Sequence, residues 1–289
     1  MALALVARSA FEAALADARE VTLCAYTLSS VGPIVRALEA AADRGARVAV
    51  RLDGHPTFGH AGSPSDASLG AAVRALADHG VHVTVTGANE PPAHLKAAVV
   101  DGVAFLDDRN WAACGDETIV RDDAAADVDS IGNAIAGRPS AFCSVALEKS
   151  AALALEAATI AAAQGDSIDV ATESFSGCAV SAALAARAQA GTHVRLAVDA
   201  RVLAADRSGR ERTLLDHLVA RGVEVRAVAS DSKLALCGDR VWIGSANATY
   251  APGPMSDWGA TTDDRDIIGR LSSGFDRAWQ TGTPIGAGP

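Results

Sequence analysis

Apolar residues follow two periods that alternate along the chain. Ile34, Leu38 and Ala41 recur at spacings of three and four, which is the pattern of one face of an α-helix. Val-rich runs bounded by glycine, such as residues 45–53, are typical of β-strands. Helical and strand patterns alternate three times and are followed by a predicted hairpin. The sequence therefore predicts an α/β protein.

The order of elements occurs twice because the sequence repeats itself. Residues 45–53 match residues 191–199, and residues 76–83 match residues 218–225. A period of about half the chain indicates two tandem α/β units and not a solenoid. We expect a first half, a linker that is acidic and Ala-rich, and a second half, with the bounds 1–123, 124–144 and 145–289.

A polar motif recurs in the two halves, 137 positions apart. Lys96 lies fourteen residues before Asn110, and Lys233 lies fourteen residues before Asn247. The shared spacing predicts a β-hairpin in each half, with the lysine entering on one strand and the asparagine following the next.

This motif resembles the HKD motif of the phospholipase D superfamily, which reads His-x-Lys, four residues, Asp, and later Gly-Ser-x-Asn. Asp108 stands at the serine position of the first copy, and Asp231 and Gly238 replace the histidine and aspartate of the second. The motif residues that the two copies keep are His94, Lys96, Asp101, Asn110, Lys233, Gly244, Ser245 and Asn247. The first motif is near-intact, and the second is degenerate.

The resemblance implies two phospholipase D-like halves related by a pseudo-twofold axis, with both motifs in one cleft. It implies a phosphodiesterase or phosphatidyl-type transferase that acts on a small phosphodiester, with His94 as nucleophile and a phosphohistidine intermediate. Lysine, amide and hydroxyl donors can stabilise phosphate oxygens, so we expect no metal and no cofactor. The expected site consists of His94, Lys96, Asn110, Asp231, Lys233, Ser245 and Asn247.

Asp231 stands where the family has the histidine that protonates the leaving oxygen. Aspartate titrates near pH ~3.9 in model peptides and histidine near ~6.5, so we expect an ionised Asp231 that cannot donate this proton. Loss of a general acid typically lowers a rate by about 10²- to 10⁴-fold. The alternative is therefore a catalytically inactive binding protein with the same cleft. A nuclease is the third alternative for the function.

Further acidic residues lie near the motifs. The family orients a histidine with an acidic residue after each motif, and the candidates are Asp116, Glu117 and Asp257. We interpret Asp101 as a structural residue of the hairpin and its lysine. We expect Asp108 to add a second carboxylate beside the pocket. Glu173 lies at a strand end and is more typical of a residue that caps a loop than of one that contacts substrate.

Composition limits the partners. The net charge is −10, with 25 basic and 35 acidic residues, which disfavours long polyanions such as nucleic acid and also anionic membranes. No apolar run has the length of a membrane span, and the N-terminus lacks the features of a signal peptide, so we expect a cytoplasmic protein without integral membrane association. The internal repeat favours a monomer that acts as its own pseudo-dimer, with a small phosphodiester or phospholipid-like substrate.

Cysteine and histidine usage gives little support for a metal. Five cysteines with no Cys-x-x-Cys pair argue against a disulfide framework and a structural zinc site. Asp53, His55 and His60 could suggest a metal site, but they fit no established ligand spacing.

Overall fold

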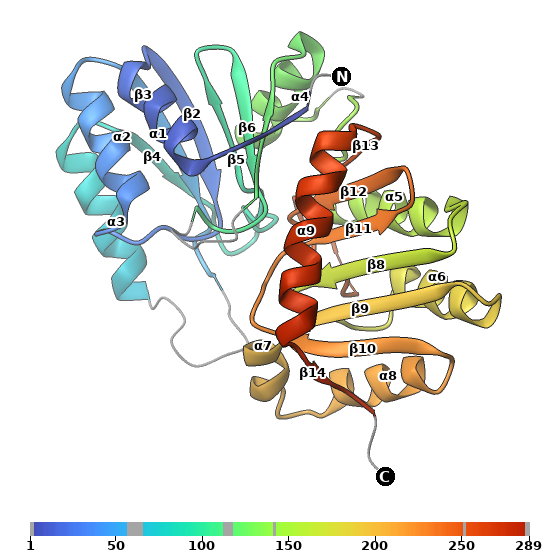
Figure 1. The fold of residues 1–289 in the computed structure, drawn as a ribbon. Coiled ribbons are helices and arrows are strands. Elements are labelled where there is room, and N and C mark those ends of the chain that lie inside the picture. Colours follow the sequence, from blue (N-terminus) through green and yellow to red (C-terminus); the bar gives the residue numbers. More distant parts are fainter. Residues whose placement is uncertain (1–2, 57–65, 112–117, 141–142, 251–252, 287–289) are drawn as a thin grey trace. The chain divides into compact units, whose positions relative to one another are not determined.

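The computed structural model describes residues 3–56, 66–111, 118–140, 143–250 and 253–286 (Figure 1). It divides into two compact units. The first runs to Glu148 and includes Gly253–Trp258, and the second takes Lys149–Pro252 and Gly259–Pro289. A short segment from late in the sequence thus belongs to the first unit.

The first unit is built on a seven-stranded sheet in the order β1-β7-β6-β5-β2-β3-β4. Its strands are β1 (Ala4–Val6), β2 (Glu20–Ala25), β3 (Arg47–Leu52), β4 (His82–Val85), β5 (Ala97–Val100), β6 (Val103–Asp107) and β7 (Ile119–Asp122). Its helices are α1 (Arg8–Asp17), α2 (Pro33–Asp43), α3 (Asp66–Asp78) and α4 (Ala125–Ile135). Strands β2, β3 and β4 are parallel, and the other pairs are antiparallel.

The second unit has a seven-stranded sheet in the order β13-β12-β11-β8-β9-β10-β14. Its strands are β8 (Ser167–Thr172), β9 (His193–Asp199), β10 (Val223–Val228), β11 (Leu234–Cys237), β12 (Arg240–Gly244), β13 (Gly259–Thr262) and β14 (Thr283–Pro284). Its helices are α5 (Lys149–Ala162), α6 (Ala179–Gln189), α7 (Ala200–Ala205), α8 (Arg210–Val219) and α9 (Arg265–Thr281).

The two sheets share six strands in the same order, which confirms the predicted α/β fold with two similar halves. Strand order β7-β6-β5-β2-β3-β4 in one unit corresponds to β13-β12-β11-β8-β9-β10 in the other. The predicted hairpins are present in the same register, because Ala97 pairs with Leu106 and Leu234 pairs with Ile243, each 137 positions later. Each unit then adds one strand of its own, β1 or β14.

The first hairpin turns at Asp101 and Gly102. Their φ angles are 46° and 81°, and a two-residue turn with both angles positive favours the Asp-Gly pair. The Asp101 carboxylate accepts hydrogen bonds from the backbone N of Arg19 and Glu20, at 3.1 and 2.8 Å. Asp101 therefore links the hairpin to the start of β2. It lies at the end of β5 opposite Lys96, so it holds the strands but not the lysine.

The expected linker 124–144 contains helix α4. Val128, Ile131 and Ile135 are spaced three and four apart and are buried against the sheet. Asp127 accepts hydrogen bonds from Ser144, which holds the following segment against the helix. Among the described residues, no helix is long and apolar enough to cross a membrane.

Candidate functional site

His94 and Lys96 lie directly before β5, at the end of the strand away from the hairpin turn. Alternate residues of an extended chain face opposite sides, so His94 and Lys96 share one side while Leu95 is fully buried on the other. The Lys96 side chain is 4% exposed and that of His94 is 19% exposed. The imidazole therefore reaches solvent while its neighbouring ammonium does not.

Asp257 contacts both side chains. Its Oδ1 lies 3.0 Å from His94 Nδ1 and 3.3 Å from Lys96 Nζ, and its side chain is fully buried. Lys96 Nζ also lies 2.7 Å from His94 Nδ1. Nδ1 can either donate to Asp257 or accept from Lys96; we favour donation, because a buried carboxylate needs its donors. The unprotonated lone pair is then on Nε2. Of the three candidate acids, Asp257 is placed beside the histidine, whereas Asp116 and Glu117 lie outside the described residues.

Tyr26 and Asp53 hold this cluster from the ends of β2 and β3. The Tyr26 ring centroid is 4.6 Å from that of His94 and 6.0 Å from Lys96 Nζ. Asp53 Oδ2 accepts a hydrogen bond from the Ala93 backbone N at 2.8 Å. Neither residue was among the expected site residues; each directly follows a strand, and that position was the available signal.

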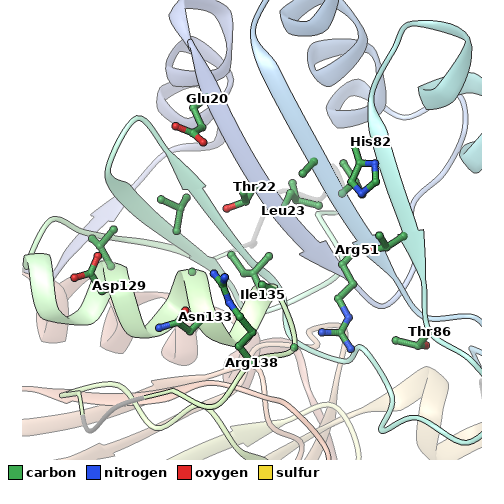
Figure 2. Close-up of a pocket in the computed structure, with 18 of the residues that line it drawn as sticks. Glu20, Thr22, Leu23, Arg51, His82, Thr86, Asp129, Asn133, Ile135 and Arg138 are labelled. Atoms are coloured by element: carbon green, nitrogen blue, oxygen red, sulfur yellow. The ribbon is translucent and has the colours of Figure 1, made fainter.

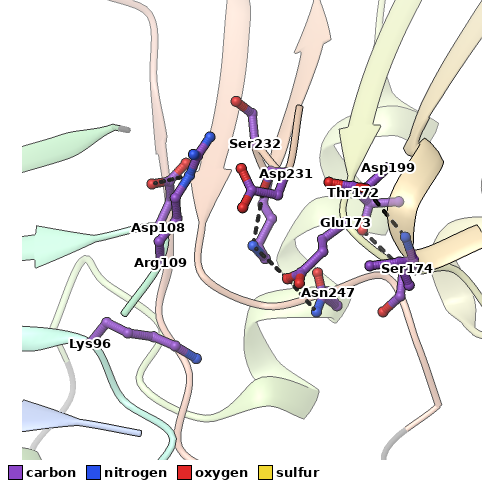
Figure 3. Close-up of polar contacts among 12 residues, drawn as sticks. Lys96, Asp108, Arg109, Thr172, Glu173, Ser174, Asp199, Asp231, Ser232 and Asn247 are labelled. Carbon is purple, nitrogen blue, oxygen red and sulfur yellow. Dashed lines mark hydrogen bonds and ion pairs between the residues drawn. The ribbon is translucent and has the colours of Figure 1, made fainter. Parts of the chain in front are cut away.

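Asp108 is buried and is held by contacts with neighbouring protein groups. Its Oδ1 accepts a hydrogen bond from Thr118 N at 3.0 Å and lies 3.6 Å from Arg109 Nε, and the side chain is 1% exposed (Figure 3). An arginine thus balances the charge of this carboxylate, which we expected beside the pocket. Asn110 Oδ1 is buried and accepts no hydrogen bond from the described residues.

The second motif forms its own cluster in the second unit. Lys233 Nζ lies 3.2 Å from Glu173 Oε2 and donates to the Asp231 carbonyl at 3.0 Å. Asn247 Nδ2 donates to Glu173 Oε2 at 3.3 Å (Figure 3), so the same carboxylate contacts both Lys233 and Asn247. Ser245 is fully buried. Glu173 is therefore bonded to motif side chains, in contrast to the loop-capping role that we expected.

Asp231 faces a positive charge. Arg201 Nη2 lies 3.5 Å from Asp231 Oδ2 and 2.7 Å from Asp199 Oδ2. Hydrogen bonds to Asp199 raise the pKa of Arg201 above its usual range, and Asp199 also caps α7. The acidic replacement in the second motif thus has a cationic neighbour.

The chain contains three lysines, and all three are buried. Lys96, Lys149 and Lys233 are 3%, 6% and 5% exposed. Lys149 Nζ donates to Thr249 Oγ1 at 2.7 Å, two residues beyond Asn247. All other basic side chains apart from histidine are arginines, so two of the three lysines belong to the motifs and the third, at the start of α5, contacts the loop that follows the second motif.

The residues that suggested a metal have other contacts. Asp53 Oδ1 accepts from the His55 backbone N at 2.8 Å, and its other oxygen is bonded to Ala93. Within the described part of the chain, no three His, Cys, Asp or Glu side chains form a group that could hold a metal ion, and His60 lies outside that part.

The expected site residues fall into two groups, each described within its own unit. His94, Lys96 and Asn110 belong to the first, and Asp231, Lys233, Ser245 and Asn247 belong to the second. The expectation that both groups serve one cleft stays a prediction.

The second half of the chain matches a known family. Residues 157–279 match the family model described as "Cardiolipin synthase, PLD-like domain". No curated protein matches the sequence.

Solved structures share the fold at low identity. Phosphatidylserine synthase from Haemophilus influenzae Rd KW20 is 11% identical with a TM-score of 0.69, and the match covers 98% of this chain and 87% of that one. Polyphosphate kinase from Porphyromonas gingivalis is 16% identical with a TM-score of 0.65; the match covers 96% of this chain but 50% of the kinase. The yeast tyrosyl-DNA phosphodiesterase H432N mutant is 8% identical with a TM-score of 0.50, over 90% of each chain.

The family match in the second half confirms the resemblance to the phospholipase D superfamily. The matches to solved structures show that nearly the whole chain shares their fold.

Proposed function

We propose that the protein is a phospholipase D-like phosphodiesterase or phosphatidyl-type transferase that acts on a small phosphodiester through a phosphohistidine at His94. The observation that carries the proposal is the position of Asp257 Oδ1, 3.0 Å from His94 Nδ1. A buried carboxylate that accepts from Nδ1 fixes the tautomer and places the lone pair of the ring on Nε2. Nε2, which lies 3.2 Å from Lys96 Nζ, is the atom that would attack phosphorus.

Lys96 supports the same role. Its ammonium lies 3.3 Å from Asp257, so the pair is balanced within the buried interior while the imidazole remains partly exposed. In the proposed first step, Nε2 attacks phosphorus, the P–N bond forms, and the bond to the leaving oxygen breaks. In the second step, water or an alcohol attacks phosphorus and the P–N bond breaks. Lysine and amide donors stabilise the charge on the non-bridging oxygens.

The second cluster favours a second candidate, a binding protein that uses the same fold without turnover. Glu173 lies 3.2 Å from Lys233, so one of the two motif lysines has a carboxylate beside it. Asp231 adds a further carboxylate where a proton donor would be needed. Both features would lower affinity for an anionic substrate and slow departure of a poor leaving group.

Substrate class follows from charge and from the relatives. The similar structures include a phosphatidylserine synthase and a tyrosyl-DNA phosphodiesterase, so the fold accommodates lipid and nucleic-acid chemistry alike. The net charge of −10 and the scarcity of lysine favour a small or phospholipid-like diester over a long nucleic acid.

Trapping of the intermediate tests the proposal. The protein is mixed with bis(4-nitrophenyl) phosphate, quenched in base, digested and analysed by mass spectrometry, because phosphohistidine survives base but not acid. The expected result is one nitrophenylphosphoryl adduct on the peptide that contains His94, absent in His94→Ala. His193→Ala, which removes a histidine that is paired with Glu224 at 53% exposure, should keep the adduct. Binding of the diester without an adduct or turnover would favour the second candidate.

A further inference from the structure

Tyr26 lies directly after β2, at the end of the strand beside His94. The other end of β2 serves a different part of the first unit, because Glu20 and Thr22 help to line a cavity of about 920 Å³ that α4 bounds on one side (Figure 2). Tyr26 is 7% exposed, and its ring centroid is 4.6 Å from that of His94. The phenol ring is therefore part of the buried surroundings of the histidine.

The Tyr26 ring turns one face towards the charged groups of the motif. Lys96 Nζ lies over this ring, 6.0 Å from its centroid. The same ammonium lies 2.7 Å from His94 Nδ1 and 3.2 Å from His94 Nε2. Both imidazole nitrogens therefore lie on the side of the Tyr26 ring that faces the ammonium, and the imidazole is closer to the ring than the ammonium is.

The proposed intermediate adds a positive charge to this cluster. When Nε2 of His94 forms the P–N bond while Nδ1 keeps its proton, the imidazole becomes cationic. Lys96 is cationic as well, and the Asp257 carboxylate lies 3.0 Å from the imidazole and 3.3 Å from the ammonium. Two cations then share one buried carboxylate, although buried charge is costly unless it is balanced. A second carboxylate would balance the charge but would also repel the phosphate oxygens.

The second unit has such a carboxylate at the equivalent strand position. Ala97 of the first hairpin and Leu234 of the second are equivalent, and the residues that pair with them in β2 and β8 lie two positions before Tyr26 and Glu173. Glu173 lies 3.2 Å from Lys233. The motif that keeps the histidine thus has an aromatic ring at this position, and the motif that has lost it has a carboxylate.

We propose that Tyr26 is a positioning residue whose ring face stabilises the cationic imidazole of His94 while it carries the phosphoryl group, a role that rests on the proposed function. The face of an aromatic ring carries negative potential and attracts a cation within about 6 Å of its centroid. The ring carries no formal charge, so it favours the cationic imidazole without neutralising Lys96 or repelling the phosphate oxygens. An interaction of this kind is expected to change the rate by about three- to thirtyfold.

The rate of P–N bond formation in the full chain tests the proposal. Bis(4-nitrophenyl) phosphate is mixed with excess protein, and release of the first nitrophenolate is followed in a single turnover. We expect Tyr26→Phe to retain most of the wild-type rate, and Tyr26→Leu to react about three- to thirtyfold more slowly. Tyr250→Leu changes the other tyrosine of the chain, which is 70% exposed, and is the matched control that should react as the wild type does.

Fluorinated phenylalanines at position 26 separate charge stabilisation from packing. Each added fluorine withdraws electrons from the ring face, whereas the shape of the side chain changes little. We expect the rate to fall stepwise from phenylalanine to its monofluoro, difluoro and trifluoro forms, and thermal unfolding confirms that each variant is folded. Equal rates across this series would overturn the role of Tyr26, while an adduct on His94 would still support the proposed function. Wild-type protein that forms no adduct and releases no nitrophenolate would overturn the proposed function, and the role of Tyr26 with it.

Discussion

His94 Nδ1 lies 3.0 Å from Asp257 Oδ1, although 163 residues separate the two in the sequence. The segment that carries Asp257 follows the second motif but belongs to the first unit. Ser256 Oγ donates to the Pro92 carbonyl, and Trp258 Nε1 donates to the Asp107 carbonyl, at 3.3 and 2.7 Å. Residues on both sides of Asp257 thus fix its position beside the histidine.

We expect Asp257→Asn to lower kcat for a phosphodiester by about 10²- to 10³-fold with a smaller change in KM. The amide is close in shape but carries no charge, so it no longer holds the imidazole in one tautomer or balances Lys96. Steady-state kinetics with bis(4-nitrophenyl) phosphate measures the effect. Asp263→Asn, at an exposed position, is the control. An unchanged kcat in Asp257→Asn would remove Asp257 from the mechanism.

Glu173→Gln should increase affinity for the diester. The carboxylate lies 3.2 Å from Lys233 Nζ, and its neutralisation frees the ammonium for a phosphate oxygen. We expect KM, and the inhibition constant of inorganic phosphate, to fall by roughly three- to tenfold. The matched control is Glu224→Gln, which neutralises an exposed acid in the same unit. If inhibition by phosphate stays the same, Lys233 does not contact the substrate.

The two hairpins could be predicted from the sequence because residues close together in the chain determine them. A fixed distance between Lys96 and Asn110, repeated between Lys233 and Asn247, requires the same strand lengths and the same turn length. Helix α4 was missed because Asp127, Asp129 and Gly132 interrupt its apolar pattern, even though the spacing of its buried residues is helical.

Side-chain contacts across distant segments could not be predicted in the same way. Asp257 lies in a loop with no periodic pattern, and its partner His94 lies in the other half of the sequence. Glu173 and Tyr26 each follow a strand, where a polar or aromatic side chain can cap a loop or reach a site. Only the packing of neighbouring strands decides between these roles, and a single sequence does not contain that information.

Glu156 should make folding stability depend on pH. Burial raises the pKa of this carboxyl from 4.5 to about 8, and its Oε2 has no hydrogen-bond partner among the described residues. Since the folded pKa is the higher one, its contribution to stability is complete below pH 4.5 and is lost as the pH rises towards 8. Each unit of difference corresponds to about 1.4 kcal/mol.

Glu156→Gln should therefore be more stable than the wild type at pH 9, by roughly 2–5 kcal/mol, with a much smaller difference at pH 4.5. Urea unfolding at several pH values between these limits measures the difference in unfolding free energy. Glu148→Gln changes an exposed glutamate next to the same helix and should show no such trend. A constant difference between Glu156→Gln and the wild type at all pH values would contradict a buried titrating carboxyl.

Chelation should leave turnover unchanged. Both oxygens of Asp53 accept backbone hydrogen bonds at 2.8 Å, so a metal ion would have to displace them. We expect the rate after dialysis against EDTA to equal the untreated rate, and added Mg²⁺ or Zn²⁺ to give no increase. Loss of activity on chelation, restored by a divalent ion, would show that a metal takes part in the mechanism. It would then contradict the proposed role of His94 as nucleophile.

The last prediction concerns Asp231. This residue lies where the family has the leaving-group acid, and Arg201 is 3.5 Å away. If this acid is missing, diesters with a nitrophenolate leaving group should react far faster than alkyl diesters, because nitrophenolate departs without a proton. Asp231→His should lower the ratio of kcat/KM for the nitrophenyl diester to kcat/KM for the alkyl diester by about 10- to 100-fold, mainly because the alkyl diester reacts faster. His94→Ala serves as the blank, and Asp239→Asn, at an exposed position, serves as the control. Similar rates on both substrates in the wild type would mean that a proton donor is present. No reaction with either substrate in wild type or Asp231→His would favour the binding protein.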